Sequence, residues 1–212
     1  MQPFSVHRSN PNRSAEMHKT LLFVQRRLCR TMKNQKVVGR RDWNGRKVSQ
    51  ADFDAGDRSA HVCPFVQDAL DRDFLWLEES NKSTQSDVEA LLQNQVDLFI
   101  HTPPVHDPVA TQLPAKTPDL WKAFITIFPF LPLDSNLIRS IHLTLKPQFV
   151  AKGLMIGEFF PGFTGQKGIH NDVDFFPGIA PYPLFAIRYM VESDRLFNRD
   201  PLYDAHYRRY FP

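Results

Sequence analysis

Two apolar segments of strand length near the C-terminus, 153–160 and 183–191, constrain the fold of this chain more than any other feature. The loop between them, 161–182, is rich in glycine, proline and aromatic residues, and six of the nine glycines fall between Gly153 and Gly178. Structureless loops of this length are uncommon in compact domains unless they are functional. Because so many aromatic side chains also argue against disorder, we expect an ordered loop packed over a pocket.

Strict alternation places one charged residue on an apolar face of each strand. Glu158 shares a face with Ile156, and Arg188 shares a face with Ala186. A buried lone charge is costly, and an Arg–carboxylate pair is a common solution. We therefore expect antiparallel neighbouring strands in which Glu158 faces Arg188, as catalytic candidates. A purely structural or surface ion pair is the alternative.

The remaining periodicity predicts an α+β fold (or α/β sandwich), a single domain with a mixed sheet of about four strands packed by helices. The predicted helices lie in 15–33, 61–73, 84–99, 134–153 and 200–210, and the predicted strands in 74–80, 121–131, 153–160 and 183–191. Thr84 and Asp87 resemble a capping box at the start of one helix. Pro64 suits the first position of another.

The N-terminal quarter differs from the rest in charge. Residues 1–60 carry 13 Lys/Arg and 5 Asp/Glu, whereas the remainder is mildly acidic. We therefore separate a basic, partly disordered extension, 1–59, from a globular domain, 60–212. The amphipathic helix 15–33 is typical either of a solvated helix lying on the body or of a mitochondrial targeting segment. A membrane or nucleic-acid anchor is a third interpretation.

The composition also limits where the protein works and what it binds. The acidic body argues against nucleic-acid binding, and no apolar run has the length of a membrane span. The two cysteines give no disulfide framework. A cytoplasmic protein with a small-molecule substrate is the simplest expectation, with mitochondrial targeting by residues 1–33 as the alternative.

Two motifs are candidate cofactor ligands. His170 and Asp172 have the His-x-acid spacing that forms half of the facial triad of non-haem iron oxygenases. The distal histidine would be His206 or His142, and His170 would equally suit a haem. Cys63 precedes Pro64 at a helix N-terminus, which favours a thiolate. The alternative for His170 is a hydrogen bond that orders its loop, and for Cys63 a small buried residue.

Charged groups in the same loop are candidate substrate ligands. Lys167, together with backbone N–H groups of the glycine-rich run, suits an anion. Asp172 or Asp174 would orient His170 or contact a polar substrate. The chain has no phosphate-binding glycine motif, Walker loop or nucleophile elbow. Neither the substrate nor a metal site follows from these residues.

Four linked motifs resemble an uncharacterised family, a domain of unknown function found in bacteria and fungi near natural-product biosynthesis genes. They are VCPFV at 62–66, LKPQFVAKGLMIGEFFPG at 145–162, GIHNDVDF at 168–175 and PLFAIRYMVESDRLF at 183–197. A fainter similarity links the chain to haem-dependent N-oxygenases, through an early Cys-Pro with an aromatic residue and a late Pro-rich loop before an Arg-containing strand.

The resemblance implies a small-molecule biosynthetic enzyme of fungal secondary metabolism, with haem- or iron-dependent oxidation as the specific expectation. From the residue patterns above, Glu158, His170 and Arg188 would be the catalytic residues, and Cys63 with His170 the cofactor ligands. A cofactor-free isomerase or cyclase is one alternative. The other is a non-catalytic accessory protein that binds a pathway intermediate.

Overall fold

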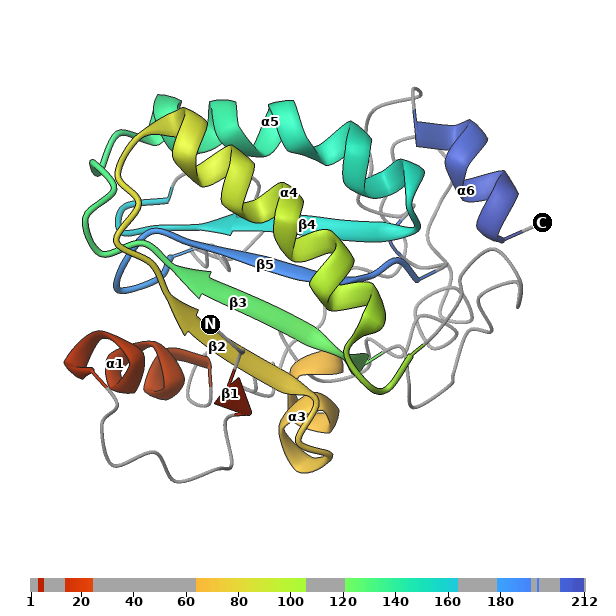
Figure 1. Cartoon of the computed structure of the whole chain (residues 1–212), viewed down its shortest axis with the longest axis horizontal. Helices are drawn as coiled ribbons and strands as arrows, with labels where there is room; N and C mark the ends of the chain where they lie inside the picture. The colour runs from red at the N-terminus through yellow and green to blue at the C-terminus, as the bar shows by residue number, and fades with distance from the viewer. Residues whose placement is uncertain are drawn as a thin grey trace, which may run out of the picture.

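The computed structural model describes residues 4–5, 14–24, 64–105, 121–163, 179–191, 194 and 203–211. These residues form an α+β fold in which helices pack on a mixed sheet, as the sequence predicted (Figure 1). The strands are β1 (Phe4–Ser5), β2 (Leu75–Glu79), β3 (Ala123–Ile127), β4 (Leu154–Phe159) and β5 (Leu184–Tyr189). The helices are α1 (Ala15–Phe23), α3 (Pro64–Asp71), α4 (Gln85–His101), α5 (Ser135–Ala151) and α6 (Asp204–Tyr210).

The sheet has the strand order β1-β2-β3-β5-β4, in which the two-residue β1 extends four main strands. Strands β2 and β3 are parallel, whereas β5 runs antiparallel to both β3 and β4. Strand β5 therefore inserts between β3 and β4, which are connected in sequence through α5. The predicted antiparallel pairing of 153–160 with 183–191 is confirmed, and β4 lies at the edge of the sheet.

Helices α4 and α5 lie side by side over one face of the sheet and bury the larger core (Figure 1). Each helix contributes an apolar stripe with helical spacing. The stripes consist of Val88, Leu92, Val96 and Phe99 on α4, and of Ile138, Ile141, Leu145 and Phe149 on α5. This core therefore determines which face of β4 and β5 points towards α5.

Helices α1 and α3 cover the opposite face and form a second, smaller core. Leu21 and Val24 of the N-terminal segment pack there with Leu75, Leu77 and Leu184. The predicted helix 15–33 thus begins at Ala15 as expected, and its continuation beyond Val24 lies outside the described residues. Helix α1 falls within 1–59, the segment that was separated from the globular domain because of its basic charge. In the structure, α1 nevertheless packs on the sheet.

Local sequence signals account for the helix ends. Thr84 is the N-cap of α4 and accepts a hydrogen bond from the Asp87 N–H, as the capping box predicted. Asp134 caps α5 in the same way. Helix α5 continues through Pro147 and is followed by Gly153 at φ 73°, a conformation that favours glycine. Among the described helices, none combines the length and apolarity of a membrane span.

Candidate functional site

The predicted contact between Glu158 and Arg188 is wrong. The register of β4 and β5 pairs Glu158 with Phe185, and Arg188 with Met155. Because directly opposed residues share a face and neighbours along a strand alternate, Glu158 and Arg188 lie on opposite faces of the sheet. They are also three positions apart along the register, roughly 10 Å. Each charged group therefore belongs to a separate cluster.

Glu158 is paired with a histidine of α5. Its Oε2 lies 2.8 Å from His142 Nδ1, and both side chains are only 13% exposed. The other ring nitrogen, Nε2, lies 3.0 Å from the carbonyl oxygen of Ile156. The Met190 N–H donates to Gly153 O, so the alternation of an antiparallel ladder turns the Ile156 carbonyl towards the free edge of β4. His142 thus binds both the backbone carbonyl at this open edge and the carboxylate of Glu158.

The contact with Ile156 fixes the tautomer of His142. A carbonyl oxygen only accepts, so His142 Nε2 carries a proton and donates it to Ile156. Only one further proton is then needed on the Nδ1–Oε2 contact. With that proton on nitrogen the pair is imidazolium and carboxylate, and with it on oxygen the pair is neutral. Glu158 therefore meets the fixed imidazole through Oε2, and among the described residues no hydrogen bond or ion pair reaches its Oε1.

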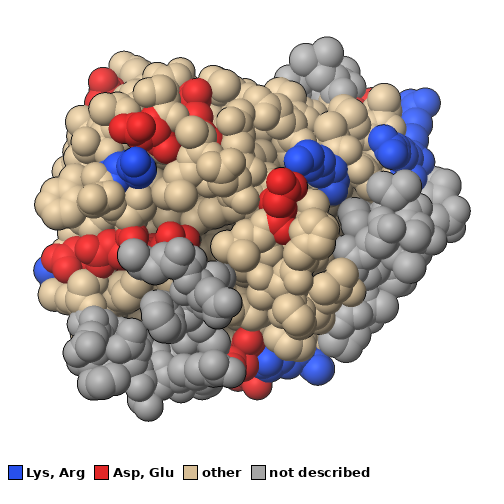
Figure 2. Space-filling model, viewed as in Figure 1, with Lys and Arg blue, Asp and Glu red and all other residues tan. Residues whose placement is uncertain are grey.

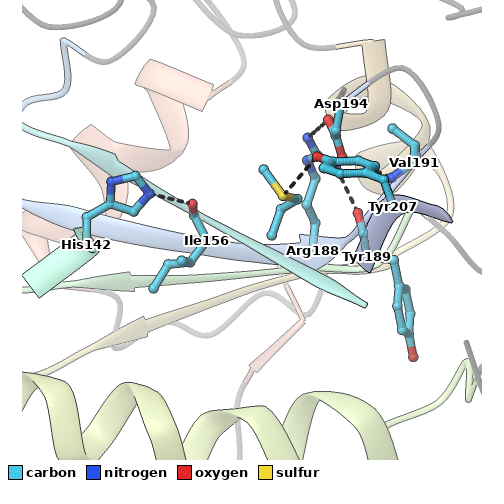
Figure 3. A network of polar contacts seen from close by, with 8 residues as sticks. His142, Ile156, Arg188, Tyr189, Val191, Asp194 and Tyr207 are labelled. Atoms are coloured by element: carbon cyan, nitrogen blue, oxygen red, sulfur yellow. Dashed lines mark hydrogen bonds and ion pairs between the residues drawn. The ribbon is translucent and has the colours of Figure 1, made fainter. Parts of the chain in front are cut away.

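Arg188 forms the second cluster, at the other end of β4 (Figure 3). Its guanidinium donates to both oxygens of Asp194, at 2.8 Å and 2.5 Å, and also to the Tyr189 carbonyl. Asp194, which is 3% exposed, also accepts from the Val191 N–H. This bidentate pair fixes the turn that follows β5.

Tyr207 of α6 lies beside the arginine cluster (Figure 3). Its hydroxyl is 3.9 Å from the sulfur of Met155, the residue that opposes Arg188 in the sheet. A second tyrosine of α6, Tyr210, donates to the Ala151 carbonyl at the end of α5. Helix α6 is therefore anchored to β4 and α5 by tyrosine hydroxyls, next to the arginine.

Two further polar groups are buried beneath α4. Lys122 is fully buried, and its ammonium donates to the carbonyl oxygens of Phe99, Thr102 and Pro104 at 2.5–2.8 Å. Thr126 donates to Gln95, which in turn donates to Glu78. The cation stabilises the negative end of the α4 dipole, and the chain of hydrogen bonds satisfies the polar atoms of the core. These contacts are explained by structure alone.

The described residues do not supply an iron site. Both nitrogens of His142 are engaged, so this ring is not available as the distal ligand considered from sequence. Within the described ranges, no group of three His, Cys, Asp or Glu side chains is arranged to hold a metal. The alternative distal histidine, His206, lies in α6 and belongs to no such group. The remaining predicted ligands and substrate contacts lie outside the described residues, namely Cys63, Lys167, His170, Asp172 and Asp174.

Sequence reasoning missed the partners of both charged strand residues. His142 follows the buried Ile141 in α5. Its place beside the apolar stripe of this helix was a signal in the sequence that the side chain could point inward. Asp194 lies just beyond β5, in the run VESD, and offered no periodic signal. Local patterns identified the buried charges, but a partner on another element depends on how the helix packs.

The surface in view in Figure 2 carries acidic and basic side chains interspersed over α4 and α5, without a continuous basic patch among the described residues. No curated protein and no solved structure matches the chain. The similarity to haem-dependent N-oxygenases and the biosynthetic gene context therefore stay predictions. The sequence model of one family, described as "Domain of unknown function (DUF6875)", matches residues 38–212, and the chain belongs to this family.

Proposed function

We propose that this protein is a small-molecule biosynthetic enzyme in which Glu158 transfers a proton to or from the substrate. The observation that carries the proposal is the half-buried Glu158–His142 pair. A general acid or base must be reachable by the substrate and held within hydrogen-bond reach of the proton that it transfers. An exposed fraction of 13% leaves Glu158 partly accessible, and the imidazole fixes the orientation of its carboxylate.

The two residues have different roles in this proposal. Glu158 Oε1 exchanges a proton with the substrate, since Oε2 is occupied by His142. His142 is a positioning residue because its Nε2 is bound to the β4 backbone. It holds the carboxylate at one orientation and stabilises its charge when the proton has left. This chemistry suits an isomerase or cyclase that needs no cofactor.

Oxidation and non-catalytic binding are the two alternative functions, and each is tested by a different measurement. Oxidation at haem or iron would depend on Cys63, His170 and Asp172, and the absorbance spectrum of the purified protein tests it directly. A non-catalytic binding protein would retain a metabolite without changing it. Neither is supported by a contact among the described residues, whereas the Glu158–His142 pair supports proton transfer.

The test compares the purified wild type with purified Glu158→Gln. Each protein is incubated in deuterium oxide with a metabolite extract of the host, and the products are examined by mass spectrometry. If Glu158 transfers a proton, the wild type converts a metabolite whose product gains deuterium. Loss of a general acid or base costs about 10²–10⁴-fold in rate, so Glu158→Gln should abolish the conversion.

Asp97→Asn is the matched control, because Asp97 is an exposed carboxylate, with 76% of its side chain accessible, on the outer side of α4. This variant should convert the metabolite at the wild-type rate. Glutamine preserves the size of Glu158, and its amide N–H can donate to the unprotonated Nδ1 of His142, so both variants should fold. A Glu158→Gln protein as active as the wild type would rule the proposal out.

A further inference from the structure

Helix α1 extends across the sheet rather than along one strand. Its N-cap, Ser14, donates to the Glu79 carboxylate at the end of β2. At the other end of the helix, the Phe23 ring packs edge-on against Phe159 of β4, with ring centroids 6.3 Å apart. Since β2 and β4 are separated by β3 and β5 in the sheet order, α1 connects the two outer main strands.

The length of the helix fits this crossing. Nine residues at about 1.5 Å each extend about 14 Å. Three strand spacings of about 4.8 Å cover the same distance. Between its two ends, α1 buries Leu21 and Val24 in the core cluster that includes Ile125 of β3 and Leu184 of β5. Every main strand of the sheet is therefore contacted by the helix or by the cluster it joins.

The same helix holds both ends of the connection between β4 and β5. Phe159 is the last residue of β4, and Tyr182 lies just before β5. Lys19 donates to the Tyr182 hydroxyl at 3.1 Å, and this hydrogen bond raises the pKa of Lys19. The ammonium stays charged at neutral pH, so the contact is present there. The Ala180 N–H to Phe160 carbonyl bond, at 3.3 Å, joins the two ends to each other.

We propose that residues 14–24 form a strap, which holds the C-terminal end of β4 against the entry of β5 through Phe23 and Lys19. Release of these two contacts, with Leu21 and Val24 still in the core, would loosen Phe159 to Phe163 and Ile179 to Pro183. Glu158 precedes Phe159, so the strap also controls the strand end that carries the candidate carboxylate. The strap lies outside the family match at 38–212. Its structural effect does not depend on the proposed function.

Hydrogen exchange of the full-length chain, followed by mass spectrometry, tests the strap. Phe23→Ala removes the contact with Phe159, and Tyr182→Phe removes the acceptor for Lys19. Phe23→Ala should raise exchange about tenfold in 159–163 and 179–183, with a smaller rise in Tyr182→Phe, because local opening governs amide exchange. Exchange in Ala123–Ile127 of β3 should stay unchanged. His18→Ala, on the exposed side of α1, is the control and should match the wild type.

Two results would overturn the proposal. Unchanged exchange at 159–163 and 179–183 in both variants would show that α1 does not hold these segments. An equal rise in β3 would show that α1 contributes to global stability only. Deletion of residues 1–24 is unsuitable because it removes Leu21 and Val24 from the core. The point variants avoid this loss, and thermal denaturation confirms that they are folded.

Discussion

His142 of α5 and Glu158 of β4 meet at 2.8 Å between Nδ1 and Oε2, and the same imidazole holds the Ile156 carbonyl through Nε2. One side chain thus links the helix, the strand backbone and the carboxylate. The edge strand is fixed at the position where the candidate acid–base group lies.

A double-mutant cycle should measure this link. His142→Ala and Glu158→Ala should each destabilise the protein, and the double variant should lose less than the sum. Half-buried charged partners in direct contact typically couple by about 0.5–3 kcal/mol, and we expect about 1.5 kcal/mol. Urea denaturation of the four proteins gives the value. Additive losses would show that the contact contributes nothing to stability.

The arginine cluster should behave as a structural ion pair. Arg188→Met leaves the Asp194 carboxylate, which is 3% exposed, without its guanidinium. Removing one partner of a buried pair typically costs about 3–5 kcal/mol, and we expect the lower value because Arg188 is 23% exposed. Adding Asp194→Asn to this variant should recover part of the loss. A double variant that unfolds as easily as Arg188→Met would contradict the pairing.

Lys122 should be essential for stability. Lys122→Met preserves the length of the side chain but leaves three carbonyl groups without their donor. An unsatisfied buried group costs about 1–3 kcal/mol. The Phe99 contact is buried and the other two are partly buried, so a total loss of about 3 kcal/mol is expected in thermal unfolding.

Lys152→Met is the matched control for Lys122→Met. Lys152 forms an ion pair with Asp97 at 3.8 Å, in which the side chains are 52% and 76% exposed. Exposed pairs contribute little, about 0–1 kcal/mol, so this variant should unfold at nearly the wild-type temperature. Equal losses in the two variants would mean that burial of Lys122 has no energetic consequence.

The hydrogen-bonded chain beneath α4 should be sensitive to its central member. Gln95→Leu leaves the Thr126 hydroxyl without its acceptor and removes the amide that donates to Glu78. We expect a loss of about 2 kcal/mol from the unpaired hydroxyl. In Gln95→Leu/Thr126→Val this hydroxyl is absent, and stability should partly return. Both values are read from the urea midpoint.

Local sequence patterns determined the secondary structure and the fold class. The stripe of Val88, Leu92 and Val96, the cap at Thr84 and the glycine after α5 each act through neighbouring residues. Short-range sterics and the period of apolar residues therefore sufficed to predict the helices and the four main strands. The two-residue β1 lies in the segment expected to be partly disordered and was not predicted. The antiparallel pairing of β4 with β5 was predicted from the expected Glu158–Arg188 contact, and the pairing is confirmed although that contact is wrong.

The tertiary structure alone decided which charges meet. A two-residue hairpin would have fixed the register of β4 and β5, but the long 161–182 connection leaves it to the packing of side chains. Glu158 thereby faces α5, and Arg188 faces the opposite side of the sheet. A charge pattern specifies that a buried carboxylate needs a partner. The packing of α5 on β4 selects His142 as that partner, because a contact between distant residues depends on the position of whole elements.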